Sequence, residues 1–330
     1  MQELDVLGIG NAIVDVIAQA DETVLHAQNI VKGGMMLIDE PRAAQLYNIM
    51  GSATMTSGGS AANTVVGIAS FGGKAGYIGK VKNDELGKHF AHDIKSSGVQ
   101  YLTQPATDGS ATACCYIFVT PDGERTMNTY LGASQNLSVD DIQETVIASA
   151  KVIYLEGYLW DPSEAKKAFR KAAEIAHAKG RQVALTLSDS FCVDRYRDEF
   201  LELMKSGTVD LVFANESELH ALYQTSDFAT AIDALRNDIK LGIVTRGDQG
   251  CVMVSSDKVT RAPASKIETL IDTTGAGDLF AAGFLHGYTQ GLDLQNCAHL
   301  GGLAAAHIIQ KVGARPAVSL KELAGQNRSA

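Results

Sequence analysis

One segment of this sequence combines a loop of small residues with an acid at the start of an apolar helix. Residues 272–278 read DTTGAGD, and the apolar residues 279–285 follow directly. Unpaired backbone N–H groups at a helix start, together with the helix dipole, attract phosphate and other anions, and glycine lets the backbone approach such an anion closely. Asp278 would lie beside the transferring group and take a proton from an incoming hydroxyl. An anion site and a base on one loop therefore predict phosphoryl transfer.

A second glycine-rich segment, residues 57–63 (SGGSAAN), also runs into an apolar helix. Its two glycines permit close approach of a ligand, and Ser60 and Asn63 supply hydrogen-bonding groups. The alternative is a turn of small residues in which Ser60 is only the N-cap of the helix. The sequence leaves both interpretations open.

An amide and a carboxylate, Asn11 and Asp15, follow the first apolar run. In an extended segment, residues four positions apart point to the same side. Because a carboxylate can accept hydrogen bonds from two hydroxyls at once, this pair suits a vicinal diol. The alternative is an Asx-turn after the strand together with one solvated acid.

Polar residues follow two further apolar runs. Asn215 and Glu218 open a helix after residues 211–214, and they can form a capping box or lie near hydrated Mg²⁺, which is commonly held by few protein oxygens and by nucleotide phosphates. Thr245 and Gly247 can line the ribose and phosphates of a nucleotide, or they can belong to a plain β-turn. Both interpretations can hold together for Asn215 and Glu218.

A single arginine, Arg125, follows the turn that residues 121–123 (PDG) predict. Arginine binds phosphate through two parallel hydrogen bonds, so Arg125 can close over a transferred phosphate. The alternative is a solvated charge on a strand.

The elements that must position these residues alternate between strands and helices. Short apolar, β-branched runs predict buried parallel strands, at residues 4–9, 75–81, 152–155, 183–187, 211–214 and 243–245. Helical patterns lie between them; one spans residues 84–97 and stops at Gly98. This alternation predicts an α/β fold with a doubly wound sheet covered by helices on both faces.

Two segments, residues 11–20 and 111–130, alternate like half-exposed antiparallel strands. They predict a small β layer over the carboxyl edge of the main sheet, where open α/β sheets bind ligands. Residues 252–262 predict another hairpin. We expect one domain over residues 1–330, with a discontinuous lid from about residues 11–57 and 100–131.

Composition excludes several classes of protein. The formal charge of −10 and the lack of a basic stripe argue against a nucleic-acid surface. The five cysteines show no zinc-ligand spacing, so buried thiols in a reducing compartment are expected. The N-terminal residues lack the basic start of a signal peptide, and no apolar run approaches the roughly 20 residues of a membrane span. The sequence therefore predicts a cytoplasmic protein without membrane or nucleic-acid partners.

Taken in order, these motifs resemble the PfkB/ribokinase-like family of carbohydrate and nucleoside kinases. The resemblance rests on residues 272–287 (DTTGAGDLFAAGFLHG), on residues 57–73 (SGGSAANTVVGIASFGG) and on the NxxE element at Asn215 and Glu218. Within the family, the adenosine kinases are the most similar, through GIGNAIVDV, KGGMMLIDE and GERTMNTYLGAS.

The resemblance implies a three-layer α/β/α ribokinase-like fold with a mostly parallel sheet and a β lid. It also implies transfer of the γ-phosphate of Mg-ATP to the 5′-hydroxyl of adenosine. A sugar kinase for ribose- or fructose-like substrates, an inosine or guanosine kinase, and a non-catalytic nucleotide-binding protein are the alternatives. Whether a monovalent cation is required, and whether the protein is a monomer or a homodimer, stays open.

The resemblance also implies roles for individual residues. Asp278 is the base, Arg125 meets the phosphate, and the anion hole consists of Gly275, Ala276 and Gly277. The expected nucleoside-binding residues are Asn11, Asp15, Gly59, Ser60, Asn63, Met127 and Tyr158. The expected walls of the base site are Ile13, Leu37, Met127 and Tyr158. The residues expected to serve Mg-ATP are Asn215, Glu218, Thr245, Gly247, Gly277 and Ala305, with Asn215 and Glu218 near the metal, through water.

Overall fold

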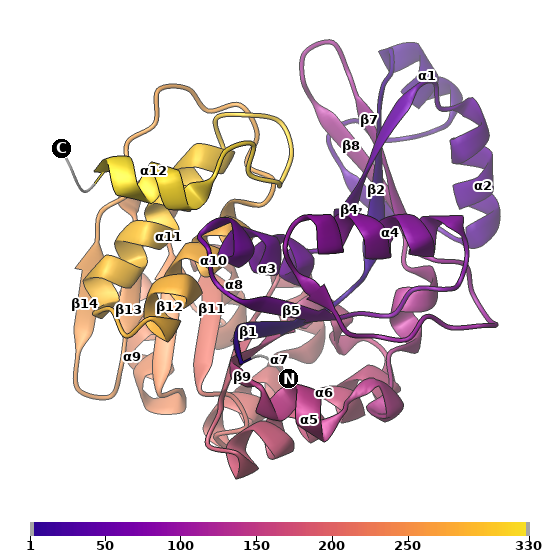
Figure 1. Cartoon of the computed structure of the whole chain (residues 1–330). Coiled ribbons are helices and arrows are strands. Elements are labelled where there is room, and N and C mark those ends of the chain that lie inside the picture. Colours follow the sequence, from indigo (N-terminus) through magenta and orange to yellow (C-terminus); the bar gives the residue numbers. More distant parts are fainter. Residues whose placement is uncertain (1–2, 328–330) are drawn as a thin grey trace.

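A nine-stranded sheet forms the main body of the protein (Figure 1), in a computed structural model that describes residues 3–327. The strand order is β14-β13-β12-β11-β10-β9-β1-β5-β6. Its strands are β1 (Leu4–Ile9), β5 (Ala75–Ile78), β6 (Gln100–Tyr101), β9 (Ala150–Glu156), β10 (Gln182–Thr186), β11 (Leu211–Asn215), β12 (Leu241–Thr245), β13 (Cys251–Val254) and β14 (Val259–Ala262). All neighbouring strands from β12 to β6 pair in parallel, as the sequence predicted. The predicted hairpin over residues 252–262 is also confirmed: it is β13–β14, which adds an antiparallel edge to the sheet.

Helices cover both faces of this sheet, as Figure 1 shows. One face carries α3 (Ser60–Ser70), α10 (Ala276–Thr289) and α11 (Leu294–Ile308), with α12 (Leu320–Asn327) packed on α3 and α11. The other face carries α5 (Glu144–Ala148), α6 (Ser163–Ala178), α7 (Ser190–Lys205), α8 (Glu216–Tyr223) and α9 (Phe228–Asp238). Successive residues of β1 pack on opposite faces of the sheet. Val6 lies in the core under α3, α10 and α11, and Leu7 lies in the core under α5 to α9. The predicted three-layer α/β/α fold is confirmed.

The predicted helix over residues 84–97 is also confirmed. It is α4 (Glu85–Ser96), which Asp84 caps by accepting a hydrogen bond from the N–H of Gly87. Gly98 follows with a φ of 85°, a left-handed conformation that favours glycine at a helix end. Short 3₁₀ helices complete the description of the main body: η1 (Gly132–Asn136), η2 (Val139–Asp141), η3 (Gly157–Trp160) and η4 (Gly247–Gln249).

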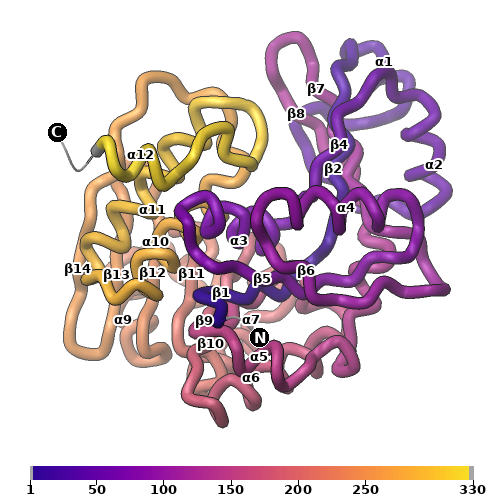
Figure 2. The backbone as a smooth tube through the Cα atoms, viewed as in Figure 1, coloured from indigo at the N-terminus to yellow at the C-terminus, as the bar shows by residue number. Residues whose placement is uncertain are grey.

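A separate five-stranded sheet, ordered β3-β8-β7-β2-β4, forms the lid. Its strands are β2 (Ile13–Gln19), β3 (Met35–Leu37), β4 (Ala53–Gly58), β7 (Ala113–Val119) and β8 (Arg125–Tyr130). Figure 2 shows that β2 and β4 run beside β7 and β8 in the lid, although these two pairs of strands are far apart in sequence. The outer face packs under α1 (Glu22–Ala27) and α2 (Glu40–Ile49), through buried side chains such as Val16, Phe118 and Leu46.

The lid differs from the prediction in two respects. Strands β2 and β7 pair in parallel, because they come from separated segments and no hairpin imposes an antiparallel arrangement. Strand β6 pairs with β5 in the main sheet, so the second lid segment begins at β7 and not near residue 100. The pairs β2–β4 and β7–β8 are antiparallel.

All five cysteines are buried and free. Within residues 3–327, no helix has the length and apolar character needed to cross a membrane.

Candidate active site

Asp278 lies in the first turn of α10 and is fixed by two side chains of α3. The Ser60 hydroxyl donates to Oδ1 of Asp278 at 2.6 Å, and Nδ2 of Asn63 donates to Oδ2 at 2.8 Å. Burial raises the pKa of Asp278, while the hydrogen bonds from Ser60 and Asn63 and the charge of Arg315 oppose this rise. The two glycine-rich segments of the sequence therefore meet at one carboxylate.

The anion loop precedes this carboxylate. Gly275 is the N-cap of α10 and has a φ of 78°, and a Cβ there would lie 2.7 Å from the Cβ of Ala314. The N–H of Ala276 donates to the carbonyl of Thr273 at 3.1 Å, so this amide is used within the loop. A Cβ at Gly277 would meet nothing within 4 Å. The loop is thus open on the side of Gly277.

Arg125 of the lid reaches this loop. Its Nε lies 3.7 Å from Oδ2 of Asp272, and its side chain is only 7% exposed. Asp272 accepts hydrogen bonds from the N–H groups of Gly313 and Thr274, at 2.9 Å each. Burial acts to raise the pKa of Asp272, but these hydrogen bonds and Arg125 lower it. Nε and Nη1 of Arg125 are buried without a hydrogen-bond acceptor in the described chain, which is the state of an arginine that can receive an anion.

Asp15 lies on the inner face of the lid, above the Gly58–Gly59 turn. A Cβ at Gly58 would lie 2.5 Å from Oδ1 of Asp15, so glycine leaves room for the carboxylate. Burial raises the pKa of Asp15 to about 6, and the charge of Asp278 adds to this rise, while Arg315 and Arg125 oppose it. Asp278 is therefore near enough to Asp15 for its charge to act on that carboxylate.

The inner face of the lid also carries an apolar surface beside Asp15. Ile13, Ile17 and Met127 pack against the small cluster of Cys115, Ile117 and Val119. Leu37 is 57% exposed on the neighbouring strand β3. Tyr158 is half-buried on η3 of the main body, where its N–H donates to Oγ of Ser188 at 3.0 Å. Of the expected base-site residues, Ile13, Leu37 and Met127 therefore lie in the lid, and Tyr158 does not.

Asn11 lies at the point where β1 leads into the lid, and one of its partners, Glu156, is a residue that sequence reasoning missed. Its Nδ2 donates to Oε1 of Glu156 at 2.7 Å, and Oε2 of Glu156 accepts from the N–H of Ala61 at 2.8 Å. Burial raises the pKa of Glu156 to about 7 against these donors. Gly59 has a φ of 102°, and a Cβ there would lie 2.2 Å from the carbonyl oxygen of Asn11. Glu156 is the last residue of the apolar strand β9, which was a readable signal.

Asn215 and Glu218 form the capping box that the sequence allowed. The Asn215 side chain accepts from the N–H of Glu218 at 2.9 Å, and both Glu218 oxygens accept from Asn215, at 3.0 and 2.6 Å. Burial raises the pKa of Glu218 to about 7. No group of three or more His, Cys, Asp or Glu side chains that could hold a metal occurs in residues 3–327.

The other residues expected to serve Mg-ATP lie in three different elements. Thr245 ends β12, next to Asn215 of β11, and its Oγ1 donates to the carbonyl of Ala214 at 3.4 Å. Gly247 opens η4 with a φ of 58°. Ala305 lies in α11 and packs partly buried against the core beneath α10.

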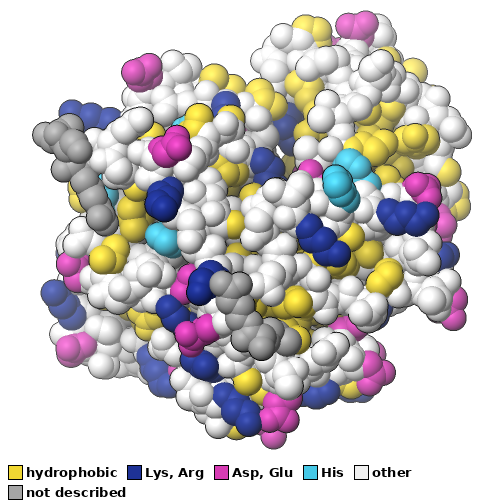
Figure 3. Space-filling model, in the orientation of Figure 1, with side chains coloured by type: hydrophobic (Ala, Val, Ile, Leu, Met, Phe, Trp, Pro, Cys, Tyr) yellow, Lys and Arg dark blue, Asp and Glu magenta, His cyan; other side chains and the backbone are white. Residues whose placement is uncertain are grey.

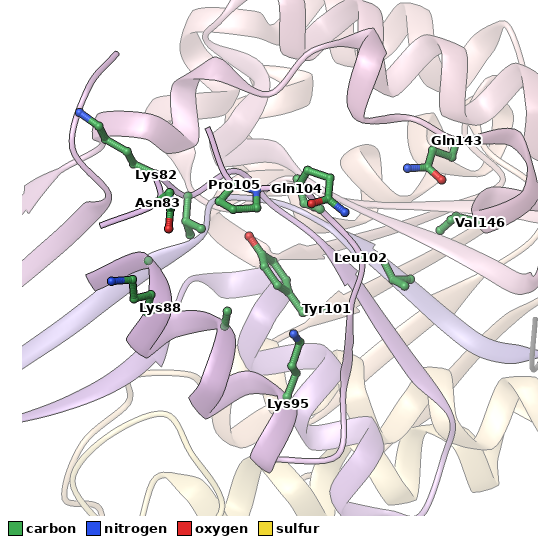
Figure 4. A pocket seen from close by; sticks show the side chains of 14 residues that line it. Lys82, Asn83, Lys88, Lys95, Tyr101, Leu102, Gln104, Pro105, Gln143 and Val146 are labelled. Atoms are coloured by element: carbon green, nitrogen blue, oxygen red, sulfur yellow. The ribbon is translucent and has the colours of Figure 1, made fainter. Parts of the chain in front are cut away.

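The protein also has a cavity that lies apart from this site. Figure 3 shows the surface hollowed between the lid and the part of the body that carries α12, with Lys or Arg side chains in the hollow. Figure 4 shows a cavity between α4 and residues 101–105, whose lining includes Lys88, Lys95 and Tyr101. Its volume is about 450 Å³. None of the expected site residues lines that cavity.

An α/β/α body with a β lid over an anion loop and a held carboxylate defines a phosphotransferase that acts on an alcohol group. The chain belongs to the pfkB family of carbohydrate kinases, whose model matches residues 7–321, and membership implies the use of ATP.

Known relatives agree with this assignment. The chain is 55% identical to adenosine kinase from Sinorhizobium meliloti, with a TM-score of 0.91 and coverage of 98% and 99% of the two chains. It is 52% identical to a probable sugar kinase protein from Rhizobium etli, with a TM-score of 0.92 over 100% of both chains. It is 27% identical over 327 residues to adenosine kinase from Saccharomyces cerevisiae, covering 92% of this chain and 94% of the relative.

Proposed function

We propose that this protein transfers the γ-phosphate of ATP to the 5′-hydroxyl of adenosine, giving AMP and ADP. The observation that carries the proposal is the Asp278 carboxylate, which Ser60 and Asn63 hold at the start of α10, directly after the anion loop. The 55% identity to an adenosine kinase over nearly the whole chain supports adenosine as the acceptor.

In the proposed reaction, the ribose diol donates to Asp15, and the 5′-hydroxyl lies against Asp278. Asp278 takes the proton of this hydroxyl as the oxygen bonds to the γ-phosphorus and the bond to the β-phosphate oxygen breaks. The anion loop, which is open on the side of Gly277, the dipole of α10 and the unpaired N–H groups of Arg125 stabilise the transferred phosphoryl group. The apolar lid face around Ile13 and Met127 covers the base and excludes water.

Magnesium is part of the proposal through the nucleotide. Mg²⁺ usually keeps several waters and binds phosphates with one or two protein oxygens. The donors present suit such an ion but not a protein-only site, since Glu218 is a single buried carboxylate already bonded by Asn215. When bound, the ion would neutralise phosphate charge, and Glu218 with Asn215 would hold its waters.

A sugar kinase is the second candidate, which the 52% identity to the probable sugar kinase from Rhizobium etli favours. Phosphorylation of adenosine, inosine, guanosine, ribose and fructose with Mg-ATP separates the two. Turnover of ribose or fructose without turnover of adenosine would refute the adenosine proposal. Turnover of no acceptor would favour the non-catalytic alternative.

We also propose that the protein acts on small molecules in the cytoplasm. The five buried free thiols are consistent with a reducing compartment. Fractionation of cells tests the compartment, and sedimentation of the purified protein decides between monomer and homodimer.

A further inference from the structure

A short segment near the end of the described chain, residues 313–315, lies between the two glycine-rich loops of the site. The N–H of Gly313 donates to Oδ2 of Asp272 at 2.9 Å. Ala314 packs against Gly275 so closely that a Cβ at position 275 would lie 2.7 Å from the Cβ of Ala314. This segment therefore supports the anion loop from behind.

The next residue, Arg315, reaches the other loop. Its Nε donates to the carbonyl of Ser57 at 3.0 Å, its Nη1 to the carbonyl of Ala62 at 3.1 Å, and its Nη2 to Oγ of Ser57 at 3.0 Å. Ser57 in turn donates from its N–H and its hydroxyl to Oδ2 of Asp93 on α4, at 2.7 and 2.6 Å. One guanidinium thus ties the last residues of lid strand β4 to the first turn of α3.

The charge of Arg315 has no carboxylate bonded to it directly. Among the ion pairs within residues 3–327, none includes Arg315, although even a half-buried charge is costly without compensation. Three carboxylates compensate it through space, those of Asp15, Asp93 and Asp278. Arg315 therefore places a fixed positive charge beside two carboxylates that repel each other.

We propose that Arg315 is a positioning residue for phosphoryl transfer: it aligns the Gly58–Gly59 turn with the anion loop and offsets the repulsion between Asp15 and Asp278. The inference deepens the proposed function and rests on it. Arg315 touches neither substrate nor phosphate in this role, because each of its three nitrogens donates to Ser57 or Ala62. Its effect on catalysis passes through Ser60, Asn63 and Asp278.

Two substitutions separate geometry from charge. Arg315→Met removes both the hydrogen bonds and the positive charge. Arg315→Lys keeps the charge but cannot make the same set of hydrogen bonds. A misplacement of about 1 Å can lower a rate by about 10²-fold, so we expect Arg315→Met to lower kcat by about that factor with KM values changed only a few-fold. Arg315→Lys should recover part of kcat. The control is Arg181→Met, which removes another partly buried arginine bonded to a carbonyl, that of Ala148.

The pH profile of kcat distinguishes this role of Arg315 from a purely structural one. Loss of the positive charge makes Asp278 harder to ionise, so the acid limb should move to higher pH in Arg315→Met and stay in place in Arg315→Lys. The other titratable groups that influence or are influenced by Asp278, namely Asp15 on β2, Tyr154 and Glu156 on β9, and Tyr158 on η3, are the same in both variants.

Amide hydrogen exchange tests the alignment without turnover. Arg315→Met should raise exchange in residues 57–62 and 273–277 together, and Arg181→Met in neither segment. The inference would be overturned if a folded Arg315→Met variant had the kcat, the pH profile and the amide exchange of the wild type. A change in KM alone would also overturn it. If Arg315→Met does not fold, Arg315→Lys with unchanged kcat and unchanged exchange overturns it. A wild type without kinase activity would refute the proposed function, while the exchange result would still decide the role of Arg315.

Discussion

The Ser60 hydroxyl donates a 2.6 Å hydrogen bond to Oδ1 of Asp278, across 218 positions of the chain. Gly59, not Ser60, is the N-cap of α3, and no side-chain cap hydrogen bond forms there. The interpretation of Ser60 as a plain helix cap is therefore wrong. Its hydroxyl serves the carboxylate of the other glycine-rich loop.

Asp278→Asn should lower kcat by about 10²–10⁴-fold, the usual contribution of general-base catalysis. Adenosine binding, measured by calorimetry, should remain, because the ribose and base contacts are elsewhere. An unchanged rate would remove Asp278 from its proposed role.

Ser60→Ala should move the acid limb of the kcat/KM profile to higher pH. The hydrogen bond from Ser60 lowers the pKa of Asp278, so its loss raises that pKa further. Because the base must be ionised, the rate then falls at a higher pH. Thr64→Val is the control, since the Thr64 hydroxyl donates to the backbone carbonyls of Ser60 and Asp278 and not to the carboxylate. Equal shifts in both variants would contradict the assignment.

Arg125→Ala should lower kcat by about 10²–10³-fold, the typical cost of losing one donor to transition-state charge. The KM for the nucleoside should change little, and Arg125→Lys should recover only part of the loss, because lysine lacks the two-pronged geometry. Steady-state kinetics of the three proteins give the answer. An effect confined to KM would show that Arg125 binds substrate in its ground state.

Nucleoside affinity should depend on the ionisation of Asp15. The diol donates to the ionised form, so affinity should fall as pH falls through about 6, the pKa of Asp15 in the free protein, and should be level above about 7. Calorimetry from about one pH unit below that pKa to about two units above it measures this dependence. Asp15→Asn should bind at least about 10-fold more weakly, the loss of a hydrogen bond to a charged group, without this pH dependence. A wild-type affinity that is flat across pH 6 would exclude a diol contact at Asp15.

Glu218→Gln separates capping from metal binding. Glutamine also suits the third position of a capping box, so stability should change little. Loss of an outer-shell carboxylate typically costs about 10–100-fold in metal affinity or activity, so half-saturation should require at least about 10-fold more free Mg²⁺. Asp227→Asn, which likewise converts a helix-capping acid to an amide, at α9, should leave the Mg²⁺ requirement unchanged. Equal Mg²⁺ titrations for wild type and Glu218→Gln would confine Glu218 to capping.

The parts of the site that follow buried strands were predictable, because an apolar run ending in polar residues marks the carboxyl edge of a sheet. Asn215, the last residue of β11, is an example. Glu156, the last residue of β9, gave the same local signal and could have been found. Arg315 gave none, since its partners Ser57 and Ala62 lie 258 and 253 positions away. The pairing of β2 with β7 was likewise beyond local patterns, which predict strands but not their neighbours.

The order in which the site is made follows from the position of its parts along the chain. A ribosome releases the Gly58–Gly59 turn and the lid strands long before Asp278 and Arg315. Domains generally fold as units, and pairings between distant segments are slow because their loops must close first. A nascent chain that has reached the end of β14 therefore still lacks the base, the anion loop and the arginine that joins the loops. Such a partly made chain cannot carry out the proposed phosphate transfer, which becomes possible only after Asp278 and Arg315 have been added.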